Sequence, residues 1–157
     1  MAVFATAECG MIFSEITVAD IPALHQIELA ANPYPWPIMA FQSSLTGLYF
    51  NFKLEVDNQL VGYVFSKIVA GQAELFNICV NPIFQGKGFG KQLLQKLIAD
   101  LTEKQVTELW LEVRASNQTA IRLYEGFGFS CADIRPNYYR NAQGAENAHI
   151  MCLAFFN

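Results

Sequence analysis

Residues 74–98 read ELFNICVNPIFQGKGFGKQLLQKLI, and this stretch organises the prediction of the whole fold. Residues 75–80 form an apolar run of the length of one buried strand, and Pro82 ends it because proline cannot donate to a sheet ladder. After a glycine-rich turn, apolar residues recur at helical spacing, namely Leu93, Leu94, Leu97, Ile98 and Leu101. The stretch therefore predicts a strand, a glycine loop and an amphipathic helix in succession.

The glycine loop is predicted to bind a diphosphate. The first N–H groups of a helix have no internal partners and carry partial positive charge, and glycines let a phosphate approach closely. A dinucleotide fingerprint counted from Gly86 would need glycine where Lys91 stands, and a Walker loop would need Gly at position 85 and Ser or Thr at position 92. The pattern that fits is Q-x-x-G-x-G at Gln85, Gly88 and Gly90, with an ordinary strand-to-helix turn as the alternative.

Length and composition favour one soluble domain. The chain has 157 residues, of which 53% are hydrophobic, enough for one substantial core. A net charge of −4 argues against a nucleic-acid-binding surface, which needs a basic face. No apolar run reaches the ~18 residues of a membrane-spanning helix. No basic region precedes an apolar core at the N-terminus, so we expect a cytoplasmic protein without a signal peptide.

The four cysteines give no sign of a metal site. They are scattered as Cys9, Cys79, Cys131 and Cys152 without a C-x-x-C pair, so we expect no bound metal. Cys79 lies in the central strand and could be considered an acyl-carrying nucleophile. Neither histidine is close to it in sequence, so no local base is evident to raise its thiolate fraction.

The order of predicted elements indicates an α/β or α+β domain with a mixed, largely antiparallel sheet. Residues 1–10 are assigned to an N-terminal extension of uncertain order, and 11–157 to a single domain. Asp20 is the expected N-cap of the first helix, and Asp57-Asn58 and Gly71-Gln72 are the expected turns. Strands are predicted over 12–18, 48–56, 60–69, 75–80, 108–113, 129–134 and 149–155. Helices are predicted over 21–31 and 38–45, and two more are expected after the glycine loop and after Ser116 or Asn117. Residues 135–146 are predicted to form a polar loop.

The second half of the chain resembles the Gcn5-related N-acetyltransferase (GNAT) superfamily. Residues 108–129, ELWLEVRASNQTAIRLYEGFGF, match the family helix N-x-x-A-x-x-L-Y-E followed by G-F. The matching positions are Asn117, Ala120, Leu123, Tyr124, Glu125, Gly128 and Phe129. LFNICV, LWLEVRASN, RPNYY and HIMCL resemble more narrowly the bacterial ribosomal-protein-alanine N-acetyltransferases, the RimI type. This resemblance is dense over 75–139 and thin before Trp36.

The resemblance implies a fold, a reaction and a cofactor. The fold would be the acyl-CoA N-acyltransferase fold, with about seven strands, splayed fourth and fifth strands and about four helices. The reaction would move an acetyl group from acetyl-CoA, without a metal, to the N-terminal alanine of the eighteenth small-subunit ribosomal protein by direct attack in a ternary complex. The resemblance also places backbone donors around Ile78 at the thioester and the Asn117 side chain at the cofactor. The expected cofactor-binding residues are Ile78, Cys79, Val80, Gln85, Gly86, Lys87, Gly88, Phe89, Gly90, Lys91 and Asn117.

Two residues are expected to move protons. Glu112 matches the family's proton acceptor, and its apolar neighbours in the strand could desolvate it, although alternation alone favours a glutamate on a solvated strand face. Tyr124 matches the family position whose phenol points at the sulfur of CoA, and its pattern alone indicates a core aromatic residue. A non-catalytic acyl-CoA-binding module would need neither side chain, so the presence of both favours an enzyme.

Three aromatic residues are predicted for the acceptor side of the site. Trp36, in a proline-rich segment, and Tyr138 with Tyr139 are the candidates to line a peptide groove, and Glu146 could meet a basic peptide. The expected partner is the N-terminus of a basic ribosomal protein, and the expected state is a monomer or weak dimer. A small molecule, a lysine side chain or another protein N-terminus remains an alternative acceptor, because a fold does not fix a substrate.

Overall fold

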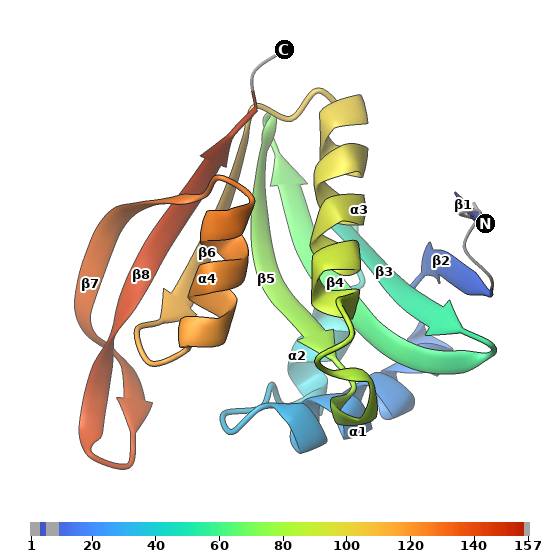
Figure 1. The fold of residues 1–157 in the computed structure, drawn as a ribbon, viewed down its shortest axis with the longest axis horizontal. Coiled ribbons are helices and arrows are strands. Elements are labelled where there is room, and N and C mark those ends of the chain that lie inside the picture. The colour runs from blue at the N-terminus through green and yellow to red at the C-terminus, as the bar shows by residue number, and fades with distance from the viewer. Residues whose placement is uncertain (1–3, 6–9, 156–157) are drawn as a thin grey trace.

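The computed structural model describes residues 4–5 and 10–155 and shows an open, twisted sheet with helices on both faces (Figure 1). The strand order is β1-β2-β3-β4-β5-β6-β8-β7, in which β5 and β6 are parallel and every other neighbouring pair is antiparallel. The strands are β1 Phe4–Ala5, β2 Met11–Glu15, β3 Tyr49–Val56, β4 Gln59–Val69, β5 Gln72–Val80, β6 Glu108–Arg114, β7 Ser130–Asn141 and β8 Gly144–Ala154. The helices are α1 Ile21–Ala31, α2 Ile38–Ser43, α3 Phe89–Glu103 and α4 Gln118–Gly126, with short 3₁₀ turns η1 Val18–Asp20 and η2 Pro82–Phe84.

This architecture confirms the expected fold class. The mixed, mostly antiparallel sheet has the predicted seven strands together with the two-residue β1, and the four predicted helices are present. The Asp57-Asn58 turn has positive φ at both residues, as a tight hairpin turn requires. The next turn falls at Ala70-Gly71, because Gln72, expected in the turn, is already the first residue of β5.

Each face of the sheet has its own helices. Helices α3 and α4 pack on one face around Leu93, Leu97 and Tyr124, and the buried side chain of Ile121 joins them. Helices α1 and α2 cover part of the other face, where Phe41 of α2 packs in a separate cluster of buried residues. Both pairs of helices are seen in Figure 1. The apolar spacing that predicted the α3 helix is therefore the spacing of its buried face.

Strands β5 and β6 separate halfway along their length. Their parallel register runs from Gln72↔Glu108 to Leu75↔Leu111 and extends no further within the described residues. At this point the β4–β5 register shifts, so that Phe76 is an extra residue between the partners of Ser66 and Phe65. A bulge bends a strand and increases its twist. The bulge at Phe76 thus accounts for the predicted splay of the two central strands.

The first strand and helix differ from the sequence prediction in detail. Strand β2 ends at Glu15 rather than at residue 18, because the chain turns into η1. Asp20 does occupy the N-cap position of α1, but its side chain makes no capping hydrogen bond to that helix. Its carboxylate instead accepts a hydrogen bond from Thr17 N at 2.8 Å and pairs with Lys53 Nζ at 2.6 Å. Asp20 therefore ties the start of α1 to β3.

The loop predicted over residues 135–146 is wrong. Strands β7 and β8 continue through it as one long hairpin whose turn lies at 142–143 (Figure 1). The hairpin stands at the sheet edge, and most β7 side chains are exposed. A strand exposed on both faces shows no apolar alternation, which is why the pattern was hidden. Between Arg135↔Ala148 and Tyr139↔Glu146, three residues of β7 oppose one of β8, and Asn137 has φ +53°.

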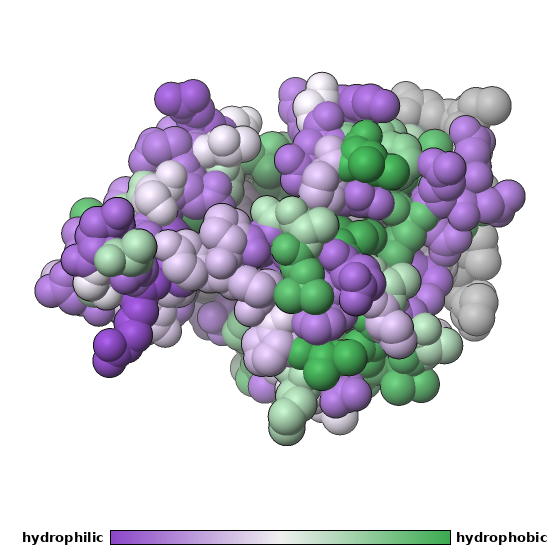
Figure 2. Space-filling view, turned by 90° about the horizontal axis from the view of Figure 1, so that it is seen from below, coloured by the Kyte–Doolittle hydropathy of each residue, from purple (hydrophilic) through white to green (hydrophobic). Residues whose placement is uncertain are grey.

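The N-terminal extension predicted over residues 1–10 falls mainly outside the described residues. Within it, Phe4–Ala5 pairs with β2 as the antiparallel strand β1. The assignment of 11–157 to a single domain stays a prediction, which one continuous sheet supports. None of the described helices combines the length and the apolar character needed to cross a membrane. Seen from below, hydrophilic residues dominate the side of the β7–β8 hairpin, and apolar residues gather over the middle of the surface (Figure 2).

Candidate active site

A cleft opens where β5 and β6 separate. It brings together six residues that the sequence predicted for the site, namely Trp36, Ile78, Glu112, Asn117, Tyr124 and Tyr139. Eight further residues complete its lining: Asn32, Tyr34, Leu75, Phe76, Asn77, Leu111, Val113 and Arg114. The cleft therefore joins the α1–α2 loop, both splayed strands, α4 and the β7–β8 hairpin.

Glu112 lies on the strand face directed away from α3 and α4. Its neighbours Leu111 and Val113 point into the core with those helices, so Glu112 points to the other face. The Glu112 Oε1 atom is 3.2 Å from Arg135 Nη1, and the Glu112 side chain is 26% exposed. A hydrogen bond to Glu112 also raises the pKa of the Tyr138 phenol. The carboxylate is partly shielded from water, as expected, but it also has a cationic neighbour that the sequence did not indicate.

Tyr124 reaches the cleft from the opposite face. Its side chain is buried on α4, and its ring lies 5.5 Å from the ring of Phe129. Burial, with a smaller contribution from Tyr139, raises the pKa of the Tyr124 phenol above its usual value. The phenol is therefore protonated at neutral pH and can donate a proton into the cleft.

The glycine loop has the backbone that close approach of a phosphate requires. Gly86 and Gly88 have φ of +76° and +84°, and no atom lies within 4 Å of a Cβ built on either residue. Gln85 Nε2 donates to Val80 O at 3.1 Å, which fixes the loop to the end of β5. A Cβ on Gly90 would lie 3.8 Å from Leu123 of α4, so the start of α3 packs beside α4. This geometry fits the pyrophosphate of an acyl-CoA held against the first N–H groups of α3.

The remaining predicted loop residues lie around this backbone. Lys87 Nζ is 5.7 Å from the centroid of the Phe84 ring, and that ring makes an edge contact with Phe89. Lys91 is exposed in the first turn of α3. The residues from Gln85 to Lys91 are not in the lining of the cleft, so the glycine loop and the cleft are separate features of the structure.

Asn117 caps α4. Its Oδ1 accepts a hydrogen bond from Ala120 N at 3.2 Å, so the helix that was predicted to follow Ser116 or Asn117 has Asn117 as its N-cap. The residue also lines the cleft. Its side chain therefore fixes the start of the helix that carries Tyr124, whatever it does for the cofactor.

Cys79 does not fit the nucleophile alternative. Its side chain is buried against α1 with Tyr63, and it does not line the cleft. Burial raises the pKa of the Cys79 thiol to about 12, so the thiol is protonated at neutral pH. Within the described part of the chain, no group of three or more His, Cys, Asp and Glu residues is placed to hold a metal ion.

The loop that carries Trp36 is held by a buried carboxylate that the sequence alone did not indicate. Glu28 on α1 is fully buried and accepts hydrogen bonds from Tyr63 Oη at 2.5 Å and Asn77 Nδ2 at 3.0 Å. It also accepts from Asn32 Nδ2 at 2.9 Å and from Trp36 N at 3.3 Å. Glu28 thereby fixes the α1–α2 loop, residues 32–37, against the central strands. The available signal was a glutamate on the apolar face of a predicted helix.

The three predicted acceptor residues take different positions. Trp36 packs on the rings of Phe41 and Phe65 at 5.3 and 5.6 Å while still lining the cleft. Tyr139 lines the cleft, but Tyr138 is 47% exposed and makes an edge contact with the Tyr139 ring at 5.0 Å. Tyr138 therefore supports Tyr139 and Glu112 from outside the cleft.

Comparison with known proteins agrees with this geometry. The acetyltransferase (GNAT) family profile matches residues 20–129 of the chain. The chain belongs to the GNAT acetyltransferase family. As expected of a GNAT acetyltransferase, it has the splayed central strands and the glycine loop that fits acetyl-CoA.

Several relatives of this GNAT protein are similar over almost their whole length. It is 46% identical to the [ribosomal protein bS18]-alanine N-acetyltransferase of Salmonella typhimurium over 89% of this chain and 95% of the relative. The protein of that name from Escherichia coli K12 is 43% identical over the same shares. The crystal structure of the ribosomal-protein-S18-alanine N-acetyltransferase from Escherichia coli superposes with a TM-score of 0.89, covering 92% of this chain and 93% of that one. Ard1 from Thermoplasma volcanium, at 21% identity and TM-score 0.81 over 94% and 99%, shares the fold.

Proposed function

We propose that this GNAT protein transfers the acetyl group of acetyl-CoA to the N-terminal alanine of ribosomal protein bS18. The observation that carries the proposal is the meeting of Glu112 and Tyr124 in one cleft, in a chain 46% identical to an enzyme named for that reaction. The expected location is the cytoplasm, where ribosomal proteins are made.

The cofactor would bind along β5 and the start of α3. The pyrophosphate would rest on the backbone of residues 85–91, and the charges of Lys87 and Lys91 would add to the attraction. The pantetheine arm would follow the β5 edge near Ile78, Cys79 and Val80, which beyond Leu75 has no β6 partner among the described residues. Backbone N–H groups there would stabilise negative charge on the thioester oxygen. Asn117 would contact the cofactor from the start of α4.

The chemistry needs one base and one acid. An N-terminal ammonium has a pKa of ~8, so it must lose a proton before it attacks. Glu112 would accept that proton, directly or through water, as the amine forms a C–N bond to the acetyl carbon. As the C–S bond breaks, the Tyr124 phenol would protonate the departing thiolate. Attack would occur directly within a ternary complex, without an acyl-enzyme.

The acceptor peptide would enter between the α1–α2 loop and the hairpin. Trp36 and Tyr139 would line its path, and Tyr138 would flank it. Phe76, Tyr124 and Tyr139 line the cleft, and their bulk would favour a small first residue such as alanine.

Peptides that differ only in their first residue test the proposal. Purified protein is mixed with acetyl-CoA and basic peptides beginning with Ala, Ser, Leu or acetyl-Ala, and thiol release and peptide mass are followed. We expect strong turnover with N-terminal alanine and none with the blocked peptide. Equal turnover with polyamines or aminoglycosides would overturn the assignment of the acceptor.

A further inference from the structure

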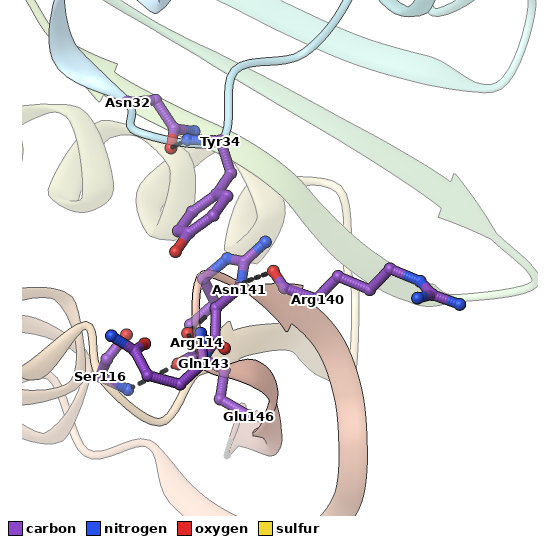
Figure 3. A network of polar contacts seen from close by, with 8 residues as sticks. All are labelled: Asn32, Tyr34, Arg114, Ser116, Arg140, Asn141, Gln143 and Glu146. Carbon is purple, nitrogen blue, oxygen red and sulfur yellow. Dashed lines mark hydrogen bonds and ion pairs between the residues drawn. The ribbon is translucent and has the colours of Figure 1, made fainter.

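Arg114, at the end of β6, contacts both the α1–α2 loop and the β7–β8 hairpin, the two segments between which the acceptor peptide would enter. Its Cζ atom lies 3.6 Å from the centroid of the Tyr34 ring in the α1–α2 loop and 4.4 Å from the centroid of the Tyr139 ring in β7. All three residues line the cleft. Figure 3 shows the Tyr34 side chain extending from its loop toward Arg114. The contact joins segments that are otherwise held by different parts of the sheet.

Polar contacts fix the guanidinium in this position. Arg114 Nη1 donates to the main-chain oxygen of Arg140 at 3.0 Å and lies 3.4 Å from Glu146 Oε2 (Figure 3). The Glu146 carboxylate also accepts from Ser116 N at 3.0 Å and from Asn141 Nδ2 at 3.3 Å. These hydrogen bonds, first of all those from Ser116, lower the pKa of Glu146 to about 2, so the carboxylate stays charged at any working pH.

The α1–α2 loop end of the contact is also fixed. Tyr34 N donates to Asn32 Oδ1 at 2.9 Å, and Asn32 Nδ2 donates to the buried Glu28 carboxylate. Tyr34 is therefore presented to Arg114 by a backbone that Glu28 holds. Tyr34 is 42% exposed, so the fold does not need it for its core.

We propose that Arg114 is a positioning residue for the acceptor, which joins the α1–α2 loop to the β7–β8 hairpin and fixes the width of the groove between them. This inference rests on the proposed function for the choice of acceptor peptide. Glu146 connects the same guanidinium to the main chain of Ser116, one residue before Asn117. The contact therefore also fixes the α1–α2 loop and the β7–β8 hairpin relative to the helix that carries Tyr124. Arg114 touches no reacting atom in this role.

The role requires an arginine. A planar guanidinium can face aromatic rings while its N–H groups bond to a carbonyl and a carboxylate. A lysine at this position would retain the charge but not the plane or the fork of donors. The two properties can therefore be separated by substitution.

Steady-state kinetics with the alanine peptide test the role. Arg114→Ala is expected to raise KM for the peptide by about tenfold while kcat and KM for acetyl-CoA stay within threefold, and Arg114→Lys is expected to recover less than half of the loss. Tyr34→Ala is expected to raise the peptide KM in the same way. Because both substitutions remove the same contact between Arg114 and Tyr34, the peptide KM of the double variant is expected to match that of the Arg114→Ala variant.

Arg140→Ala is the matched control. It removes a positive charge from the same hairpin, but the Arg140 side chain points away from the network in Figure 3, and its main-chain oxygen is retained. We expect its peptide KM to stay within twofold of the wild-type value. An equal rise in Arg140→Ala and Arg114→Ala would reduce the effect to general charge and overturn the proposal.

Hydrogen exchange gives a readout that does not depend on the acceptor. Without substrates, Arg114→Ala is expected to speed amide exchange at Asn32, Tyr34 and Trp36, the loop residues that are not proline, with α3 unchanged. Unaltered exchange there, an unaltered peptide KM, or an equal rise in KM for acetyl-CoA would each overturn the role of Arg114. A wild-type protein inactive on every alanine peptide would instead overturn the proposed function, and exchange would still decide whether Arg114 joins the α1–α2 loop to the β7–β8 hairpin.

Discussion

Glu112 and Tyr124 line one cleft from opposite faces of the sheet. Two side chains on opposite faces of an intact sheet would be separated by its backbone. Here the parallel pairing of β5 and β6 stops at Leu75↔Leu111, next to the bulge at Phe76, and the sheet opens between them. A thioester that enters from the α3–α4 face and an amine that enters from the other face could then meet in this opening of the sheet.

Replacing Glu112 tests proton removal. Glu112→Gln keeps the shape of the side chain and an oxygen for Arg135, but the amide cannot take a proton at neutral pH. We expect kcat to fall about 10²-fold, measured by thiol release with saturating peptide. Glu103→Gln, exposed at the end of α3, is the matched control and should be unaffected. A Glu112→Gln variant with wild-type kcat would return Glu112 to a structural role.

Replacing Tyr124 tests protonation of the leaving group. Tyr124→Phe removes only the hydroxyl, and the ring can still pack on Phe129 in the same buried space. We expect kcat to fall about 10²-fold, with the melting temperature little changed. The variant is assayed at saturating acetyl-CoA, so that a weaker cofactor affinity is not mistaken for slower chemistry. Full activity at saturation would exclude the phenol as the acid.

Replacing Gly88 tests the proposed cofactor site. Gly88→Ala meets no neighbouring atom, but φ +84° strains any residue with a Cβ, by roughly 1 kcal/mol. Relief of that strain would turn the first N–H groups of α3, so we expect the Kd of acetyl-CoA to rise about tenfold in titration calorimetry. Gly144→Ala, at φ +118° beside the distant hairpin turn, is also strained and should leave the Kd unchanged. Equal affinities in both variants would place the diphosphate elsewhere.

Replacing Glu28 tests how the α1–α2 loop is held in place. Glu28→Ala leaves the buried Tyr63 hydroxyl and the half-buried Asn77 amide without their carboxylate, and we expect a loss of about 3 kcal/mol or more in the free energy of unfolding. Glu28→Gln keeps one acceptor oxygen and should lose less. Urea titration measures both, with the exposed Glu125→Ala as the control. A loss below 1 kcal/mol in Glu28→Ala would mean that the network is not needed for stability.

Stability is expected to fall at alkaline pH. Burial raises the pKa of the Tyr63 and Tyr124 phenols and brings the pKa of Cys79 and of Tyr139 to about 12 each. A raised folded-state pKa gives stability that is fully present below the unfolded pKa, ~8.5 for Cys and ~10 for Tyr, and is lost as the pH rises through the folded value.

Urea unfolding at several pH values measures this loss. We expect a constant free energy of unfolding up to about pH 8, then a fall that approaches ~1.4 kcal/mol per pH unit for each group that ionises only on unfolding. Cys79→Ala should remove the earliest part of the fall, between pH ~9 and ~10. A free energy that stays level to pH 10 in the wild-type protein would contradict the protonated state of these buried groups.

Local patterns predicted most of the elements because each pattern has a local cause. The spacing of Leu93, Leu97 and Leu101 marks a helix face, and alternation in residues 108–113 marks a half-buried strand. The part of the β7–β8 hairpin within residues 135–146 was predicted as a loop because most of its side chains are exposed, so the sequence shows no apolar alternation there. The bulge at Phe76 was missed because it depends on the register with β4 rather than on the residue itself.

The sequence by itself determined the strand, the glycine loop and the helix, the resemblance to GNAT acetyltransferases and the choice of Glu112 and Tyr124. These features depend on residue type and on short spacings along the chain. Only the tertiary structure decided that the two side chains share a cleft, that Glu28 holds the acceptor loop and that Arg114 contacts both Tyr34 and Tyr139. Those relationships join residues from separate strands, helices and loops, and their distances are set by how the sheet twists and opens.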